Sequence, residues 1–194
     1  MTRSTVPLFS FLKHGGDVLN AFMRALVGSQ PVSAYLEDKF PVARGRRTAS
    51  HTDLVLVCPD VAVAVEAKWT KPRYERCTEW LMPHKPNLGN RSAVLSGWLS
   101  LLQPFTLKAL SIDDVGQAVY QTLHRASSAC SFGLKPELVD LQFTPSPDGG
   151  AASSAELLAD LNRLHEAIGS PPDLRFRLIQ VALDPHPSFS ASGC

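Results

Sequence analysis

Apolar residues recur along this chain with two different periods, and each period predicts a type of element. Residues 53–58 and 61–69 are almost continuously apolar except for charges at their outer ends, which is typical of strands buried on both faces. Residues 137–144 and 173–183 alternate between apolar and polar positions, as half-buried strands do. These four segments are therefore predicted to be strands.

Other segments carry apolar residues three and four positions apart, which is the period of a helix. This spacing predicts helices over 16–29, 91–102, 111 to about 130 and 154–168. Residues 32–42 fit a helix end, a short strand, or both. The succession predicts an α/β protein whose first strands form an antiparallel meander and whose later strands are joined through helices.

A Pro-Asp turn at 59–60 joins the two apolar strands, and a tight turn there decides which residues face each other. Asp53 then lies opposite Glu66 at the open end of the hairpin. Lys68 follows two residues later and points to the same face. The pairs nearer the turn are Val57 with Ala62 and Val55 with Ala64.

The carboxylates of Asp53 and Glu66 are expected to lie close together, because facing residues have Cβ atoms ~4.5–5.5 Å apart. Two carboxylates at that distance repel each other unless a cation or a proton lies between them. Their hard oxygens suit Mg²⁺ or Mn²⁺, and Lys68 can neutralise a developing charge or orient a water. The alternative is a salt-bridged cluster in which Lys68 simply pairs with one of the carboxylates. Apolar flanks make buried charges costly, which favours a functional site.

Asp53, followed on the next strand by Glu66-Ala67-Lys68, resembles the active-site pattern of the PD-(D/E)XK nuclease superfamily, although Thr52 replaces the proline of the family name. The order of elements resembles that family's αβββαβ core. The resemblance implies an α/β, restriction-endonuclease-like fold: a mixed central sheet flanked by helices, with a helical insertion after the third strand. The resemblance covers the core at about 15–145. Chain length predicts a single domain over 1–194, with an insertion at about 70–110, a C-terminal helix and strand at 153–183 and a frayed tail at 184–194.

The resemblance also implies an activity, namely divalent-metal-dependent hydrolysis of phosphodiester bonds in DNA or RNA, with DNA as the expected substrate. Asp53, Glu66 and the backbone carbonyl of Ala67 would hold Mg²⁺ or Mn²⁺. Lys68 would position the attacking water. Members of the family often have a further acidic residue on the first helix, and Glu37 is the best candidate for it here.

The helix after the lysine-bearing strand often carries glutamines that face the active site in this family. Gln117 and Gln121 stand four positions apart and would share one helix face. They would hydrogen-bond a metal-bound water or Lys68, or else they are two solvent-exposed glutamines. His124 and Arg125 follow on the same predicted helix and could also face the site.

Basic residues are concentrated in the half of the chain that holds this pattern. Residues 1–100 contain 13 Lys and Arg against 8 Asp and Glu, whereas residues 101–194 contain 6 against 10. Such asymmetry points to a polyanionic partner. Arginine forks match phosphate geometry, so a nucleic-acid contact is expected from the basic residues and the histidine near the open strand ends. The candidates are His51, Arg44, Arg46, Arg47, Lys71 and Arg73.

The composition is that of a globular chain, with 44% hydrophobic and 19% charged residues. Its four cysteines form no CxxC pair, the N-terminus has no long apolar run, and the longest apolar segments are shorter than the ~20 residues of a membrane span. We therefore expect a cytoplasmic protein with reduced thiols and no membrane segment. Two other functions remain open: a catalytically inactive nuclease-fold module that binds nucleic acid or a protein, and an unrelated α/β domain with a buried salt bridge. A homodimer is a further hypothesis, because one site per chain needs two copies to cut both strands of a duplex.

Overall fold

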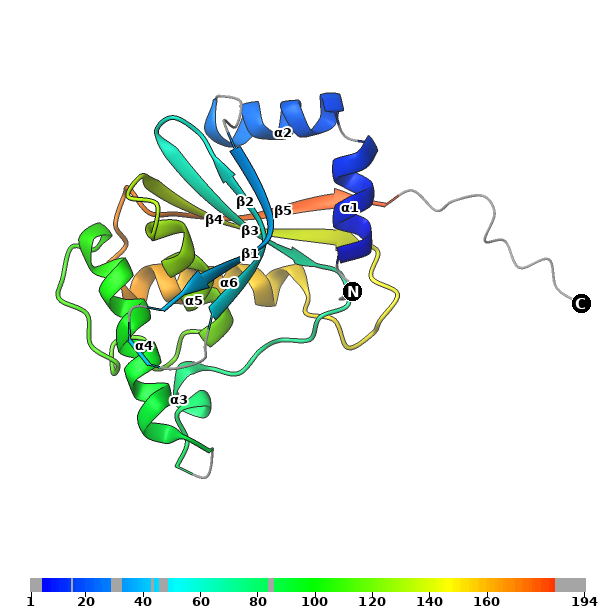
Figure 1. Cartoon of the computed structure of the whole chain (residues 1–194). Coiled ribbons are helices and arrows are strands. Elements are labelled where there is room, and N and C mark those ends of the chain that lie inside the picture. The colour runs from blue at the N-terminus through cyan, green and yellow to red at the C-terminus, as the bar shows by residue number, and fades with distance from the viewer. Residues whose placement is uncertain are drawn as a thin grey trace, which may run out of the picture.

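The computed structural model describes residues 5–14, 16–28, 33–42, 44–45, 49–83 and 86–183. They form a five-stranded mixed sheet with helices on both of its faces (Figure 1). β1, β2 and β3 are antiparallel neighbours, whereas β4 runs parallel to β3 and β5 parallel to β4. The α/β class predicted from the sequence is therefore confirmed. In their order across the sheet, the strands are β1 (Ser33–Pro41), β2 (Ala49–Val57), β3 (Val61–Lys68), β4 (Lys135–Thr144) and β5 (Arg175–Ala182).

The two faces of the sheet are covered by different helices. Leu8 and Met23 pack on the face that carries Val65, whereas Leu123 packs with Ala64 on the opposite face. The first face therefore belongs to α1 and α2, and the second to α4, α5 and α6. The helices are α1 (Thr5–His14), α2 (Gly16–Val27), α3 (Cys77–Trp80), α4 (Leu88–Leu102), the short 3-10 helix η1 (Gln103–Phe105), α5 (Tyr120–Cys130) and α6 (Ser154–Ala167).

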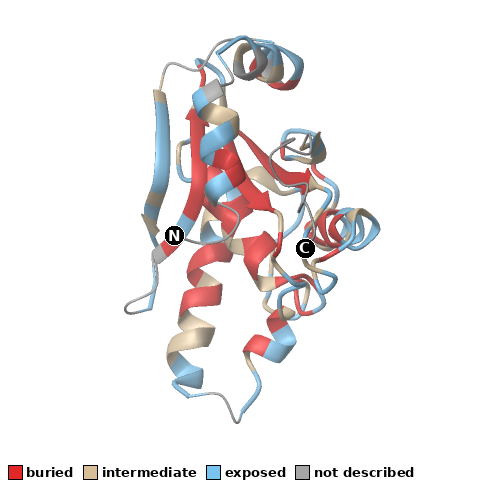
Figure 2. Cartoon of the chain, turned by 90° about the vertical axis from the view of Figure 1, so that its right-hand side faces the viewer, coloured by how far each residue is buried: buried red, intermediate tan, exposed pale blue. Residues whose placement is uncertain are grey.

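The hairpin of β2 and β3 has the register that the turn predicts. Val57 pairs with Ala62 and Val55 with Ala64, and the Cys58 N–H donates to the Val61 carbonyl at 2.8 Å. Every residue of β3 after Val61 is buried, as continuous apolar character predicts for an inner strand. β1, at the edge of the sheet, is mostly exposed, and Figure 2 shows the contrast with the buried inner strands.

The helix predicted from residue 111 begins only at Tyr120, and this prediction is wrong over its first half. The intervening backbone bonds to another segment: the N–H groups of Cys77 and Thr78 donate to the carbonyls of Ala118 and Gly116. Backbone groups committed to that pairing cannot form the i to i−4 bonds of a helix. The Ser111 hydroxyl still accepts from the N–H of Asp114 at 3.3 Å, but it closes a turn rather than capping a helix.

The remaining helix and strand predictions agree with the structure within a few residues. Residues 33–41, left open between helix and strand, form β1. α6 begins with a capping box, in which the Ser153 hydroxyl accepts from the Glu156 N–H and the Glu156 carboxylate accepts from the Ser153 N–H. α1 was not predicted from the sequence. The predicted frayed tail at 184–194 lies outside the described residues.

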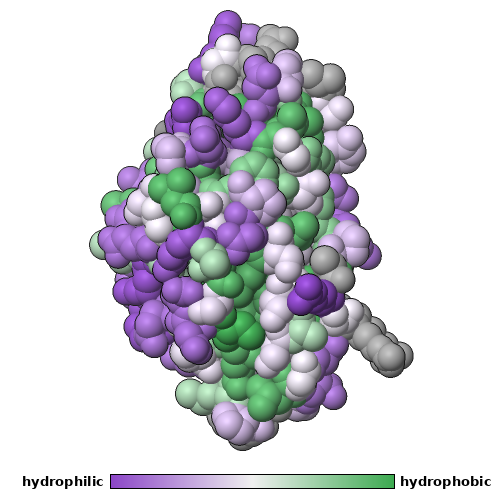
Figure 3. Space-filling model, turned by 90° about the vertical axis from the view of Figure 1, so that its left-hand side faces the viewer, coloured by the Kyte–Doolittle hydropathy of each residue, from purple (hydrophilic) through white to green (hydrophobic). Residues whose placement is uncertain are grey.

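The surface of the described residues is mixed in character. Figure 3 shows hydrophobic residues interspersed with hydrophilic ones on one side of the molecule. In the part of the chain that the structure describes, no helix combines the length and apolar character needed to cross a bilayer.

Two glycines let α4 lie against the connection between β1 and β2. A Cβ on Gly97 would lie 2.5 Å from Val42 Cγ2 and 2.9 Å from the backbone nitrogen of Arg44. Gly45, with a φ of 91°, has no room for a Cβ next to Val94 of α4 either. The inserted helix is therefore packed against the connection that leads into β2, the strand that carries Asp53.

Replacing Gly97 with alanine should destabilise the protein, because the backbone of Arg44 has to move. We expect Gly97→Ala to lower the free energy of unfolding by about 1–3 kcal/mol, the usual cost of overpacking. Gly89 lies in the same helix, and a Cβ there would have open space around it among the described residues, so Gly89→Ala should be neutral or stabilising by up to about 1 kcal/mol. Urea unfolding of both variants tests this, and equal stabilities would contradict the close contact.

Candidate active site

β2 and β3 part next to Asp53, and the opening between them contains charged side chains. Pairing of β2 with β3 runs from the turn as far as Leu54 and Val65 and stops before it reaches Asp53. Among the described residues, Asp53 is paired with neither Glu66 on β3 nor Glu37 on β1. Instead, the Asp53 carboxylate accepts a hydrogen bond from the Ala67 N–H at 2.8 Å. The predicted backbone pair of Asp53 and Glu66 is therefore wrong, although the register that led to it is right.

Asp53 and Glu66 nevertheless share one cation. The Lys71 ammonium donates to Glu66 Oε1 at 2.8 Å and lies 3.5 Å from Asp53 Oδ2. Lys71 belongs to the segment that leaves the end of β3, whereas the carboxylates come from two neighbouring strands. The carboxylates of Asp53 and Glu66 thus lie close together, as the sequence predicts. The cation between them is Lys71, which was predicted to contact nucleic acid instead.

Glu66 is the most enclosed charge of the site, with 1% of its surface exposed. Its Oε1 also accepts from Gln121 Nε2 at 2.8 Å, its Oε2 accepts from Arg125 Nε at 2.6 Å, and the Lys68 ammonium is 3.8 Å away. Burial acts to raise the pKa of Glu66, but Lys68, Arg125 and Lys71 outweigh it and lower the pKa to about 2. The side chain is therefore a carboxylate at neutral pH.

Asp53 has the opposite balance. Burial, and next the neighbouring charge of Glu66, raise the pKa of Asp53 above its ordinary value of 3.8, against the lowering effect of Lys71 and of the Ala67 N–H. Its ionised form consequently depends on having a cation nearby. The pair is asymmetric, with one carboxylate held by several partners and the other dependent on the shared cation.

Lys68 is held in place by Gln121. Its ammonium donates to Gln121 Oε1 at 2.5 Å and lies 5.2 Å from the centre of the Tyr74 ring. The same amide donates through its nitrogen to Glu66, so Gln121 links the lysine and the carboxylate. The prediction that Gln121 faces the site is confirmed.

Arg125 reaches Glu66 from α5 and connects it to the start of β2. Its Nη1 donates to the Ser50 hydroxyl at 2.7 Å, and Ser50 Oγ lies 2.9 Å from His124 Nδ1. Burial lowers the pKa of His124 well below 6.5, followed by the effect of Arg125, so the imidazole is neutral at pH 7 and its Nδ1 can accept the hydroxyl proton of Ser50. This chain fixes the orientation of the Arg125 guanidinium.

A third carboxyl group, Asp140 on β4, lies on the same face and was missed in the sequence. It pairs with Glu66 in the parallel register of β3 and β4 and is 5% exposed. Burial raises the pKa of Asp140 to about 6, with Lys68 opposing. Asp140 also lines a small pocket together with Lys68 and Gln121. The available signal was the acidic residue between Val139 and Leu141, in a segment predicted to be a strand.

Comparison with known protein families classifies the chain. A family model described as "Domain of unknown function (DUF6946)" matches residues 1–173. The chain belongs to the DUF6946 family. No curated protein and no solved structure matches it. The DUF6946 match covers every residue of the site described above.

Two side chains predicted for the site lie elsewhere in this DUF6946 protein, and a third, His51, is exposed but close enough to act on the charge of His124. Gln117 is exposed and accepts a hydrogen bond from Arg76 Nη1 at 2.8 Å, because it precedes α5 instead of lying on it. Glu37 is exposed, with a φ of 50°, and the structure does not bring it to the carboxylates. His51 is exposed on β2.

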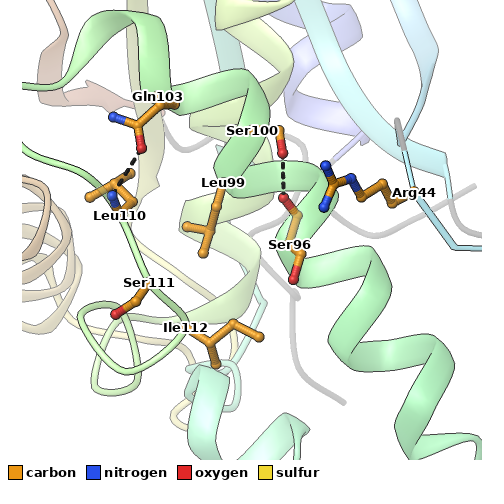
Figure 4. Close-up of a pocket in the computed structure, with 8 residues that line it drawn as sticks. All are labelled: Arg44, Ser96, Leu99, Ser100, Gln103, Leu110, Ser111 and Ile112. Carbon is orange, nitrogen blue, oxygen red and sulfur yellow. Dashed lines mark hydrogen bonds between the residues drawn. The ribbon is translucent and has the colours of Figure 1, made fainter.

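The basic candidates for nucleic-acid contact divide into separate places. Lys71 bridges the carboxylates, and Arg73 binds Asp160 of α6 through Nε at 2.9 Å and through a second contact from Nη2. Arg44 lines a pocket of about 380 Å³ beside α4, where its guanidinium lies near Ser96 and Ser100 (Figure 4). Arg46 and Arg47 lie outside the described residues.

Two carboxylates are the acidic groups that the site would offer to a hard divalent cation. Asp53 and Glu66 offer carboxylate oxygens that already share the Lys71 ammonium, which marks one position where a cation contacts both. Within the described residues, no group of three or more His, Cys, Asp or Glu is arranged to hold a metal, so the predicted backbone carbonyl of Ala67 and water would have to complete the set.

Removing Arg125 should expose how strongly the buried Glu66 depends on its cations. We expect Arg125→Met to lower the free energy of unfolding by about 3 kcal/mol, at the low end for a broken buried pair because Lys68 and Lys71 remain. Combining it with Glu66→Gln should cost less than the sum of the two changes. Arg163→Met, which removes a partly exposed partner of Asp160, should cost at most about 1 kcal/mol. Urea unfolding measures Arg125→Met, Glu66→Gln, the double variant and Arg163→Met. Additive effects of Arg125→Met and Glu66→Gln would contradict the coupling.

Asp140 should make the stability of the protein fall as pH rises. Its raised pKa means that the folded chain binds the proton more tightly, so this contribution is complete below its ordinary value of 3.8 and is lost as pH rises through about 6. The difference between the two values corresponds to roughly 3 kcal/mol. The free energy of unfolding of Asp140→Asn, relative to that of wild type, should therefore rise by about 2–3 kcal/mol from about pH 4 to about pH 7. Urea unfolding at both pH values tests this, and a constant difference between the two proteins would contradict it.

Proposed function

We propose that this protein is a divalent-metal-dependent nuclease that hydrolyses phosphodiester bonds, with DNA as the substrate. The observation that carries the proposal is the convergence of two buried carboxylates on one cation, with Lys68 fixed on the same face. Asp53, Glu66 and the Ala67 carbonyl would hold the metal, and Mg²⁺ or Mn²⁺ suits these oxygen ligands.

The architecture supports the same proposal. α2, β1, β2, β3, α5 and β4 follow one another in the αβββαβ order of the PD-(D/E)XK nucleases, within a mixed sheet. α3 and α4 lie between β3 and α5, at the place of a helical insertion. The acidic and basic residues lie where β2 and β3 part, so the opening in the sheet coincides with the charged cluster.

The chain's own residues have distinct tasks in this reaction. A bound divalent metal would neutralise phosphate charge and acidify water. Lys68, fixed by Gln121, would orient the attacking water and stabilise the negative charge that develops on the phosphoryl oxygens. Arg125 and Gln121 hold the Glu66 carboxylate in one orientation. Water adds to phosphorus and loses a proton to solvent, the P–O ester bond breaks, and the leaving oxygen takes up a proton from solvent.

A second function is favoured by one specific observation. Three cations surround Glu66, and Lys71 already satisfies both carboxylates. A catalytically inactive nuclease-fold module would keep this arrangement and bind nucleic acid or a protein partner without metal. Its nucleic-acid binding would weaken with salt, and neither metal nor Lys68→Ala would change it.

Nuclease assays on single- and double-stranded DNA and RNA test the proposal directly. We expect Mg²⁺ or Mn²⁺ to support cleavage and EDTA to stop it. Asp53→Ala, Glu66→Ala and Lys68→Ala should each reduce cleavage at least ~100-fold, as loss of an electrostatic catalytic group does. Lys135→Ala is the matched control, because Lys135 is exposed at the opposite end of β4 from the site and should leave cleavage unchanged.

Circular dichroism and urea unfolding of each variant separate lost chemistry from lost folding. Metal-independent, salt-sensitive binding without cleavage of any substrate would favour the inactive module. Full activity in Lys68→Ala would contradict the assigned role of that lysine.

A further inference from the structure

The segment that follows β3 brings Lys71 to the carboxylate pair, and it is bonded to other parts of the chain. We call residues 69–76 the strap. The Lys71 carbonyl accepts from the Ala152 N–H at 3.1 Å, Trp69 Nε1 donates to the Pro145 carbonyl at 3.1 Å, and Arg73 binds Asp160. The backbone beneath Lys71 is therefore held from other parts of the chain, independently of what its side chain binds.

Lys71 differs from the other two cations of the site in its position. Arg125 binds the far oxygen of Glu66 and is tied to Ser50, and Lys68 is tied to Gln121. Among these three side chains, only Lys71 contacts both Asp53 and Glu66, and its own side chain is 14% exposed. Its ammonium thus occupies the point at which the carboxylates converge, and Lys71 is the most exposed of the three cations.

A divalent cation and this ammonium cannot share that point, because like charges at contact distance repel and both need the same carboxylate oxygens. Lysine carries its charge on a flexible four-carbon stem, so rotation of the side chain is an easier movement than release of an anchored backbone. Movement of Lys71 away from the carboxylates therefore needs no unfolding of the strap.

We propose that Lys71 is the resident counter-ion of Asp53 and Glu66, and that a divalent cation enters the site by displacing its ammonium. The inference rests on the proposed function for the identity of the entering cation. It assigns Lys71 as a positioning residue that keeps the two carboxylates together without metal and weakens metal binding. The sequence suggested a different role for this residue, namely contact with nucleic acid.

Metal binding to the full chain tests this without any assay of activity. Isothermal titration with Mn²⁺ and Mn²⁺ electron paramagnetic resonance should show that Lys71→Met binds Mn²⁺ roughly 10-fold or more tightly than wild type, a typical size for coupling between two competing ligands. Lys71→Arg keeps the charge and should bind no more tightly than wild type. Lys135→Met, which removes an exposed lysine at the other end of the sheet, should also match wild type.

Thermal unfolding gives a second readout. Without metal, Lys71→Met should melt below wild type, because the two carboxylates have lost their shared cation. Added Mn²⁺ should raise the Tm of Lys71→Met by more than that of wild type. If Lys71→Met is unfolded without metal, its folding on addition of Mn²⁺ supports the proposal. If Lys71→Met fails to fold even with Mn²⁺, and Lys71→Gln binds Mn²⁺ with wild-type affinity, the proposal is contradicted.

The outcomes separate this inference from the nuclease proposal. Tighter Mn²⁺ binding in Lys71→Met without cleavage of any nucleic acid leaves the role of Lys71 standing and overturns the nuclease. Metal-dependent cleavage by wild type with equal Mn²⁺ affinity in Lys71→Met and wild type overturns the role of Lys71 alone. Absence of Mn²⁺ binding in both proteins at millimolar concentration overturns both.

Discussion

One fully buried carboxylate, Glu66, has to be neutralised by nearby cations and hydrogen-bond donors, and this requirement governs how the surrounding elements are placed. An ionised carboxylate removed from water is stable only where cations and hydrogen-bond donors surround it. Here those groups come from β3, from the strap and from α5. The helix, the strand and the strap are therefore fixed relative to one another by the needs of a single charge.

The two faces of the sheet show how the same strands serve different purposes. Towards α1 and α2, the strands present Leu54, Leu56, Val63 and Val65, and this largely apolar face also holds the buried ion pair of Glu137 and Arg177. Towards α5, the face begins apolar at the turn with Ala62 and Ala64 and becomes charged at Glu66 and Lys68. The apolar face stabilises the sheet strongly enough for the other face to hold three carboxyl groups and three cations, since buried charges contribute little net stability.

Local features of the sequence predicted those parts of the structure that depend on local physics. The hairpin register follows from its turn, and α6 follows from the helical spacing of its apolar residues, so both could be read from neighbouring residues. The helix predicted from residue 111 failed because residues 116–119 bond to 75–78, a pairing that no local period reveals. Lys71 was assigned to nucleic acid for the same reason, since its position depends on the path of the strap. Asp140 was overlooked because parallel pairing of β4 with β3 brings it beside Glu66 only in three dimensions.

Asp53 sits at a break in the sheet while its neighbours in the chain remain paired. On the β1 side, Leu36 pairs with Leu54 and Asp38 with Thr52, so the pairing continues immediately before and after Asp53. The position of the residue is thus set by the pairs that flank it, and its carboxylate is free to replace a backbone partner for Ala67. In such a sheet, the paired neighbours fix the position of Asp53, and the missing backbone pair leaves its side chain able to bind another group.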